Sequence, residues 1–70
     1  MNNPYLSDEA TSTVEYLNGV TRVAFTPNPV EPTGQLLSVS RNGDMVWAHV
    51  HFDGASAPEY IDARQLRRIK

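Results

Sequence analysis

The sequence predicts an all-β fold, a small five-stranded barrel with one short helical turn before its last strand. An Asn-Gly pair at positions 42–43 lies between two runs of alternating apolar residues, which is the pattern of a tight β-hairpin. Three prolines within residues 27–32 exclude a helix or a central strand there, because proline lacks an amide donor and fixes φ. Further short apolar runs, separated by turn residues, continue to the end of the chain.

The composition indicates one small globular domain. The chain has 70 residues, of which 40% are hydrophobic, which favours a folded chain with a thin core over a disordered one. It has no cysteine, which excludes a disulfide framework, a thiolate nucleophile and a cysteine-bound metal. No apolar run approaches the length of a membrane span, and residues 1–4 lack the basic and apolar regions of a signal peptide. We therefore expect a cytoplasmic protein with no membrane partner.

Residues 7–18 fit two different structures. In a helix, a serine caps the first turn and Gly19 ends the last one. In a strand, a second Asn-Gly turn makes a hairpin in which Glu15 pairs with Arg22. A Thr-Ser-Thr run in the middle has low helix propensity, which favours the hairpin for residues 13–17 after one helical turn.

The rest of the chain reads as five strands and one helical turn. We expect the strands at residues 20–26, 34–40, 45–52, 59–61 and 67–70. Residues 27–32 form a stiff loop after the first strand, and Asp62 caps a helical turn at residues 63–66 before the last strand. Residues 1–19 then form an N-terminal extension, and residues 20–70 form the barrel.

The central hairpin sets which side chains reach the core. With Asn42-Gly43 as a two-residue loop, Val39 lies opposite Val46 and Leu37 lies opposite Ala48. Because side chains alternate between the faces of a strand, one face is wholly apolar. That inner face collects Leu37, Val39, Val46, Ala48, Val50 and Phe52. The outer face collects Leu36, Ser38, Ser40, Met45, Trp47, His49 and His51.

The order of these elements resembles that of the SH3-like barrels, a group that includes the Tudor and KOW domains. The resemblance lies in a strand, a glycine-led strand, a hairpin and a leucine-bearing turn, at residues 20–25, 33–39, 46–54 and 60–66. It covers residues 20–70 and implies an SH3-like barrel, but it implies no particular function because one fold hosts many functions. The chain is also similar in size to small phage- or prophage-encoded proteins.

Two histidines raise the question of a metal site. His49 and His51 are two residues apart on one strand, so both side chains point to the same face, and Asp53 continues that parity. A tight zinc site needs further ligands, and the chain has no third histidine and no cysteine. We therefore expect no metal and no cofactor. The sequence also lacks a nucleophile elbow with an oriented base, so we expect a non-catalytic protein.

The outer face of the hairpin is the candidate partner surface. Apolar bulk on a solvent-facing side and a stiff loop both favour binding. The candidate residues are Leu36, Met45, Trp47 and His49, with Pro29 and Pro32 of the loop. A competing interpretation is that the same chain covers Trp47 through Tyr5, Leu6 or Leu17. The leading function is a non-catalytic protein-interaction module, such as a small phage accessory or host-modulating protein, that binds a protein partner or itself.

The alternative function is nucleic-acid binding through the basic C-terminus. Arg64, Arg67, Arg68 and Lys70 lie in the last seven residues with no acid among them, and Trp47 offers a ring for base stacking. The net charge of −2 argues against a general duplex-DNA binder.

Overall fold

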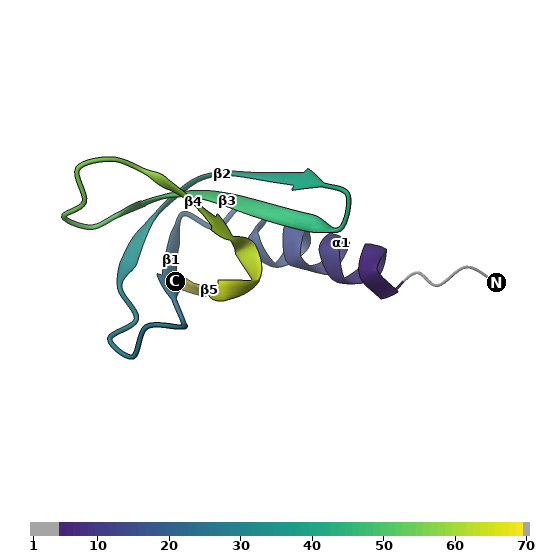
Figure 1. Cartoon of the computed structure of the whole chain (residues 1–70), viewed down its shortest axis with the longest axis horizontal. Coiled ribbons are helices and arrows are strands. Elements are labelled where there is room, and N and C mark those ends of the chain that lie inside the picture. The colour runs from purple at the N-terminus through teal and green to yellow at the C-terminus, as the bar shows by residue number, and fades with distance from the viewer. Residues whose placement is uncertain (1–4, 70) are drawn as a thin grey trace.

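The computed structural model describes residues 5–69, with side chains from residue 9 onward, so Lys70 and the side chains of Tyr5 and Leu6 lie outside the described part. One helix precedes five strands and a short 3₁₀ turn (Figure 1). The elements are α1 (Tyr5–Leu17), β1 (Arg22–Phe25), β2 (Thr33–Asn42), β3 (Met45–Phe52), β4 (Glu59–Asp62), η1 (Ala63–Gln65) and β5 (Leu66–Ile69). The five predicted strands and the helical turn before the last of them are confirmed.

The five strands form one antiparallel sheet in the order β4-β3-β2-β1-β5. β4 and β5 are its two edges and do not pair with each other, so the predicted closed barrel is wrong and the sheet stays open. Each of these edge strands has four residues, and the chain passes from one to the other through η1. As predicted, Asp62 caps that turn, because its carboxylate accepts a hydrogen bond from the Arg64 amide.

Residues 5–17 form one helix, α1, so the favoured hairpin over residues 13–17 is wrong. Ala10 and Leu17 are two turns apart on one face of α1, and each is only 2% exposed in the core. This burial outweighs the low propensity of the Thr-Ser-Thr run, since most helix stability in proteins comes from packing an apolar face. Thr13 adapts to the helix by donating its hydroxyl hydrogen to the Glu9 carbonyl at 2.8 Å.

The helix ends where glycine allows it. Gly19 has φ of +76°, the left-handed conformation common just after a helix, and the Val20 amide donates to the Leu17 carbonyl. The Asn-Gly pair of residues 18–19 therefore ends a helix instead of turning a hairpin. Because residues 13–17 are not a strand, the predicted Glu15–Arg22 cross-strand pair does not form.

The central hairpin forms with its turn one residue later than predicted. Asn42 pairs with Met45, so Gly43 and Asp44 are the two loop residues and Val39 pairs with Ala48. Gly43 has φ of +63°, and Asp44 does not have a positive φ. This combination is that of a type II′ turn, in which only the first loop residue has a positive φ. The predicted pairs of Val39 with Val46 and of Leu37 with Ala48 are wrong. When the centre of the turn moves by one residue, each residue of β2 pairs with a residue two positions further along β3. A shift of two positions keeps the alternation of side chains, so the two faces of β3 remain as predicted.

A β-bulge changes the faces at the start of β2. The register shifts between Leu36 and Ser38, because Leu37 is the extra residue. Leu36, predicted on the outer face, is therefore buried with 9% exposure, while Leu37, predicted in the core, is 45% exposed.

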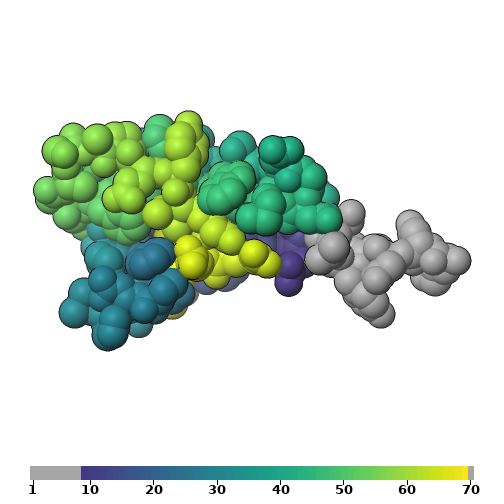
Figure 2. Space-filling view, in the orientation of Figure 1, coloured from purple at the N-terminus to yellow at the C-terminus, as the bar shows by residue number. Residues whose placement is uncertain are grey.

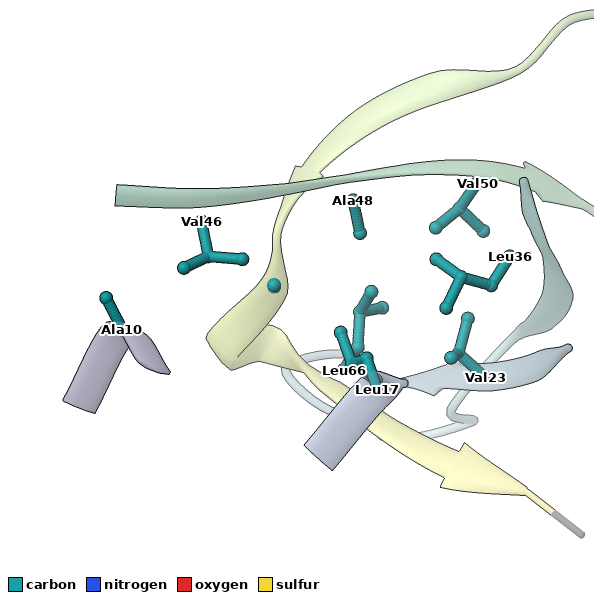
Figure 3. Packing of buried hydrophobic residues seen from close by; sticks show 9 residues of the cluster. Ala10, Leu17, Val23, Leu36, Val46, Ala48, Val50 and Leu66 are labelled. Carbon is teal, nitrogen blue, oxygen red and sulfur yellow. The ribbon is translucent and has the colours of Figure 1, made fainter. Parts of the chain in front are cut away.

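The core lies between α1 and the concave face of the sheet. Figure 3 shows Val46, Ala48 and Val50 pointing from β3 toward residues of α1, β1, β2 and β5. The buried cluster consists of Ala10, Leu17, Val23, Leu36, Val46, Ala48, Val50, Ala63 and Leu66. α1 is thus part of the same core as the strands. Within residues 5–69, no helix has the length and apolar character needed to cross a membrane.

The close approach of β2 and β3 at Gly34 gives a prediction on stability. A Cβ atom at this position would lie 2.7 Å from the His51 carbonyl oxygen and 2.8 Å from Phe52 Cα, both of which are backbone atoms. We expect Gly34→Ala to lower the free energy of unfolding by about 1–3 kcal/mol, because the strands must separate to admit the methyl group. Urea denaturation measures this change. Gln35→Ala, at the exposed next residue, is the control, and an equal loss in both variants would contradict the explanation.

Candidate functional site

Three ring side chains gather on the outer face of the sheet, which is the face of β2, β3 and β4 opposite α1. Across β3 and β4, His49 pairs with Tyr60 and Trp47 pairs with Asp62. Because Val46, Ala48 and Val50 point to the core, the residues between them point outward. The His49 and Tyr60 rings stack with centroids 4.4 Å apart and planes 9° apart.

We call Trp47, His49 and Tyr60 the ring cluster. Tyr60 is 66% exposed and Trp47 is 36% exposed, which is unusual for side chains of this size. Met45 is half-buried at the same parity of β3. The sequence therefore identified Trp47, His49 and Met45 as sharing a face, but not Tyr60 as part of the surface. The residue that Tyr60 pairs with depends on the register between β3 and β4, and the sequence of the connecting residues 53–58 does not determine that register.

The other predicted surface residues lie elsewhere. Leu36 is in the core, and Pro29 is exposed in the loop between β1 and β2. Pro32 lines an apolar groove of about 320 Å³ together with Phe25, Phe52, Glu59 and Ile61. In Figure 2 this loop and the β3–β4 connection lie one above the other at the left end of the molecule. Glu59 and Ile61 pair with the core-facing Val50 and Ala48, whereas Tyr60 between them points to the outer face. The groove beside Pro32 and the ring cluster therefore lie on opposite faces of the sheet.

α1 does not lie on the side of the sheet that carries Trp47. Leu17, one of the residues expected to cover the indole, is buried in the core on the opposite face. Tyr5 and Leu6, the other two, are among the residues whose side chains are not described. With 36% of its surface exposed, Trp47 is accessible to a partner.

The two histidines have different surroundings. His51 Nε2 lies 2.8 Å from the Ala55 carbonyl oxygen, and because a carbonyl only accepts, that nitrogen carries the hydrogen. His49 instead stacks on Tyr60. Among the described side chains, no group of three or more metal-ligating residues comes together. The absence of a tight zinc site at His49 and His51 stays a prediction.

Asp53 forms an ion pair that the sequence did not indicate. Arg22 on β1 donates from both terminal nitrogens to the Asp53 carboxylate, and the Thr33 hydroxyl donates to it at 2.7 Å. The Arg22 hydrogen bond, followed by that of Thr33, lowers the pKa of Asp53 to about 2. The pair joins β1 to the turn after β3, where Arg22 and Thr33 engage the Asp53 carboxylate.

The basic C-terminal residues are held by acids and by an aromatic ring of the same chain. Arg64 lies 3.0 Å from Asp62 and 3.6 Å from Glu9, and Arg67 lies 3.0 Å from Glu31. The Arg68 guanidinium lies 4.5 Å from the centroid of the Tyr16 ring. η1 ends at Gln65, so Arg67 and Arg68 are neighbours on a strand and point to opposite faces. Arg64, Arg67 and Arg68 therefore do not share one helical face.

Comparison of the chain with protein-family models, with curated proteins and with solved structures finds no match. The geometry of the ring cluster and of its surroundings is therefore the guide to function.

The exposure of Trp47 can be measured directly, because it is the only tryptophan of the chain. We expect iodide and the neutral quencher acrylamide both to quench the emission of the folded monomer efficiently, since part of the indole is in solvent. The urea-unfolded chain gives the value for full exposure. Native emission that neither quencher reduces would show that the chain covers Trp47.

The Arg22–Asp53 pair predicts a dependence of stability on pH. The folded pKa of Asp53, about 2, is below the value of about 3.9 in an unfolded chain, so the pair stabilises the fold above that value. This stabilisation is lost as the pH falls from about 4 to about 2. We expect the urea midpoint of Asp53→Asn to fall less than that of the wild type over this range. Asp44→Asn, in the exposed hairpin turn, is the control and should retain the wild-type slope.

Proposed function

We propose that the chain is a non-catalytic protein-interaction module whose ring cluster contacts a protein partner. The observation that carries the proposal is the side-by-side exposure of Trp47, His49 and Tyr60 on the sheet face opposite α1. Large aromatic side chains bury much area and lose little conformational freedom on binding, so they are frequent anchors of protein interfaces. Strands β3 and β4 hold the rings in place, which lowers the entropic cost of binding.

The charges around the ring cluster favour a protein over a nucleic acid. Asp62 is the cross-strand neighbour of Trp47 and is ion-paired with Arg64, so this pair offers a phosphate backbone no net positive charge beside the indole. Arg64 and Arg67 are already paired with carboxylates of the chain. Nucleic-acid binding therefore remains the second candidate.

We also propose a likeness to SH3-like domains in the order of the elements, although the sheet is open and the likeness by itself implies no particular function. β2 is led by Thr33-Gly34, and η1 precedes the last strand, as the resemblance implied. We infer a small accessory protein that acts by binding, of the kind that phage-type host-modulating proteins represent.

The test is a pull-down from lysate of the native host with variants of the ring cluster. Trp47→Thr and Tyr60→Thr remove the rings but keep a residue that favours strands. We expect each to lose the proteins that the wild type retains. Val30→Thr, which removes a side chain that is 81% exposed in the β1–β2 loop, is the matched control and should retain them.

Salt and nuclease separate the two candidate functions. Capture through the ring cluster should persist in high salt and after nuclease treatment, because it depends on apolar contact. Capture that high salt or nuclease abolishes would contradict the proposal. Capture that both Trp47→Thr and Tyr60→Thr retain would also contradict it.

A further inference from the structure

The strand β2 extends well beyond the strand that pairs with it. β1 pairs with β2 only at Thr33, Gly34 and Gln35, and the Leu36 amide then donates to the Thr21 carbonyl. Within residues 5–69, no strand pairs with the β1-facing side of residues 37–42, which we call the free edge. In Figure 1 this part of β2 belongs to the long hairpin that projects from the sheet above α1. An unpaired edge presents backbone donors and acceptors that another strand can bind.

A groove runs beside the free edge. It has a volume of about 260 Å³ and is lined by Val14, Leu17, Asn18, Val20 and residues 36–39. Leu37, the extra residue of the bulge, lies in this lining and is 45% exposed. The free edge therefore combines unpaired backbone with an apolar side chain and a place for an incoming side chain.

We propose that a second copy of the chain pairs with the free edge, strand against strand and antiparallel, around a two-fold axis at Val39. The two sheets then join through their β2 strands, and both copies of α1 lie on the same side of the joined sheet. This interface is independent of the ring cluster, which lies on the face of the sheet opposite the helices.

The spacing of the helices fits a second copy. α1 packs against both β2 and β3, so its axis lies near the line between them. Neighbouring strands are about 4.8 Å apart, which puts the two α1 helices about 10 Å apart across a β2–β2 pair. Packed helices lie about 8–10 Å apart, so the second copy brings its helix to a distance at which the two can pack. A bare peptide strand would supply no such contact.

The charges along the edge also fit a second copy. Arg41 is the only charged residue of the free edge, and the two-fold axis places it beside Leu37 of the other copy and never beside itself. The Arg41 guanidinium already lies next to α1, where it donates to the Thr11 hydroxyl. Glu15, one helical turn after Thr11, is exposed on the same side of α1. Arg41 of the second copy therefore approaches a carboxylate, and this occurs twice by symmetry.

The test introduces a charge at the free edge and follows the mass of the intact chain by sedimentation over a concentration series. We expect the wild type to show a monomer–dimer equilibrium. Leu37→Lys places like charges beside each other and should raise the dissociation constant at least about tenfold. Leu37→Glu, which removes the same apolar side chain, is the matched control and should dimerise more tightly than Leu37→Lys.

A charge exchange tests the register. Arg41→Glu alone should weaken the dimer, because it brings a second carboxylate toward Glu15 of the other copy. Adding Leu37→Lys should restore the dimer, because the introduced lysine then lies beside the introduced glutamate of the other copy. Circular dichroism checks that each variant is folded. An unfolded single variant is replaced by the double variant Ser38→Lys, Ser40→Lys, which should weaken the dimer because the two-fold axis places each introduced lysine beside one of the other copy. A wild type that stays monomeric at every concentration overturns the proposal. Equal effects of Leu37→Lys and Leu37→Glu, or no rescue by the exchange, also overturn it.

Discussion

The fold depends on one constraint, the burial of the inner row of β3 against α1. Val46, Ala48 and Val50 are each at most 3% exposed, and Ala10 and Leu17 of the helix pack on the same cluster. Strand geometry then leaves no choice for the residues in between, which must point to the other side. The exposed ring cluster is thus the counterpart of the core. Its position is as well fixed as the core itself, because a shift of β3 by one residue would put the rings into the core and the valines into solvent.

The sequence predicted what depends on alternation and on single turn residues. The faces of β3, the five strands and the Asp62 cap were all deduced in this way. It failed where contacts across the chain decide the outcome. Nothing in the residues around Leu37 marks a bulge, and the low helix propensity of the Thr-Ser-Thr run favoured a hairpin over the helix that buries Leu17. The pairing of His49 with Tyr60 requires a register across a six-residue connection, so that part of the candidate site was not predicted.

Unequal strand lengths leave part of β2 without a partner strand. β2 has ten residues, whereas β1, β4 and β5 have four each. Only the first part of β2 has a partner on its β1 side, and α1 covers the face of the projecting hairpin but not its edge. Natural edge strands are commonly protected by charges, bulges or short length. Here Arg41 and the bulge at Leu37 lie on the free edge, so the residues that limit uncontrolled pairing are also those that select a register.

The two proposed surfaces are compatible because they face different directions. The ring cluster projects along the normal of the sheet, while the free edge lies in the plane of the sheet. A two-fold axis along that normal places both ring clusters on the same side of the joined sheet, opposite the two helices. Such a dimer would offer two identical binding faces in a fixed geometry. A partner with two matching sites would then bind the second face at a high effective concentration, which raises the overall affinity without any new contact. The strength of binding by this small protein would therefore depend on its own concentration as well as on that of its partner.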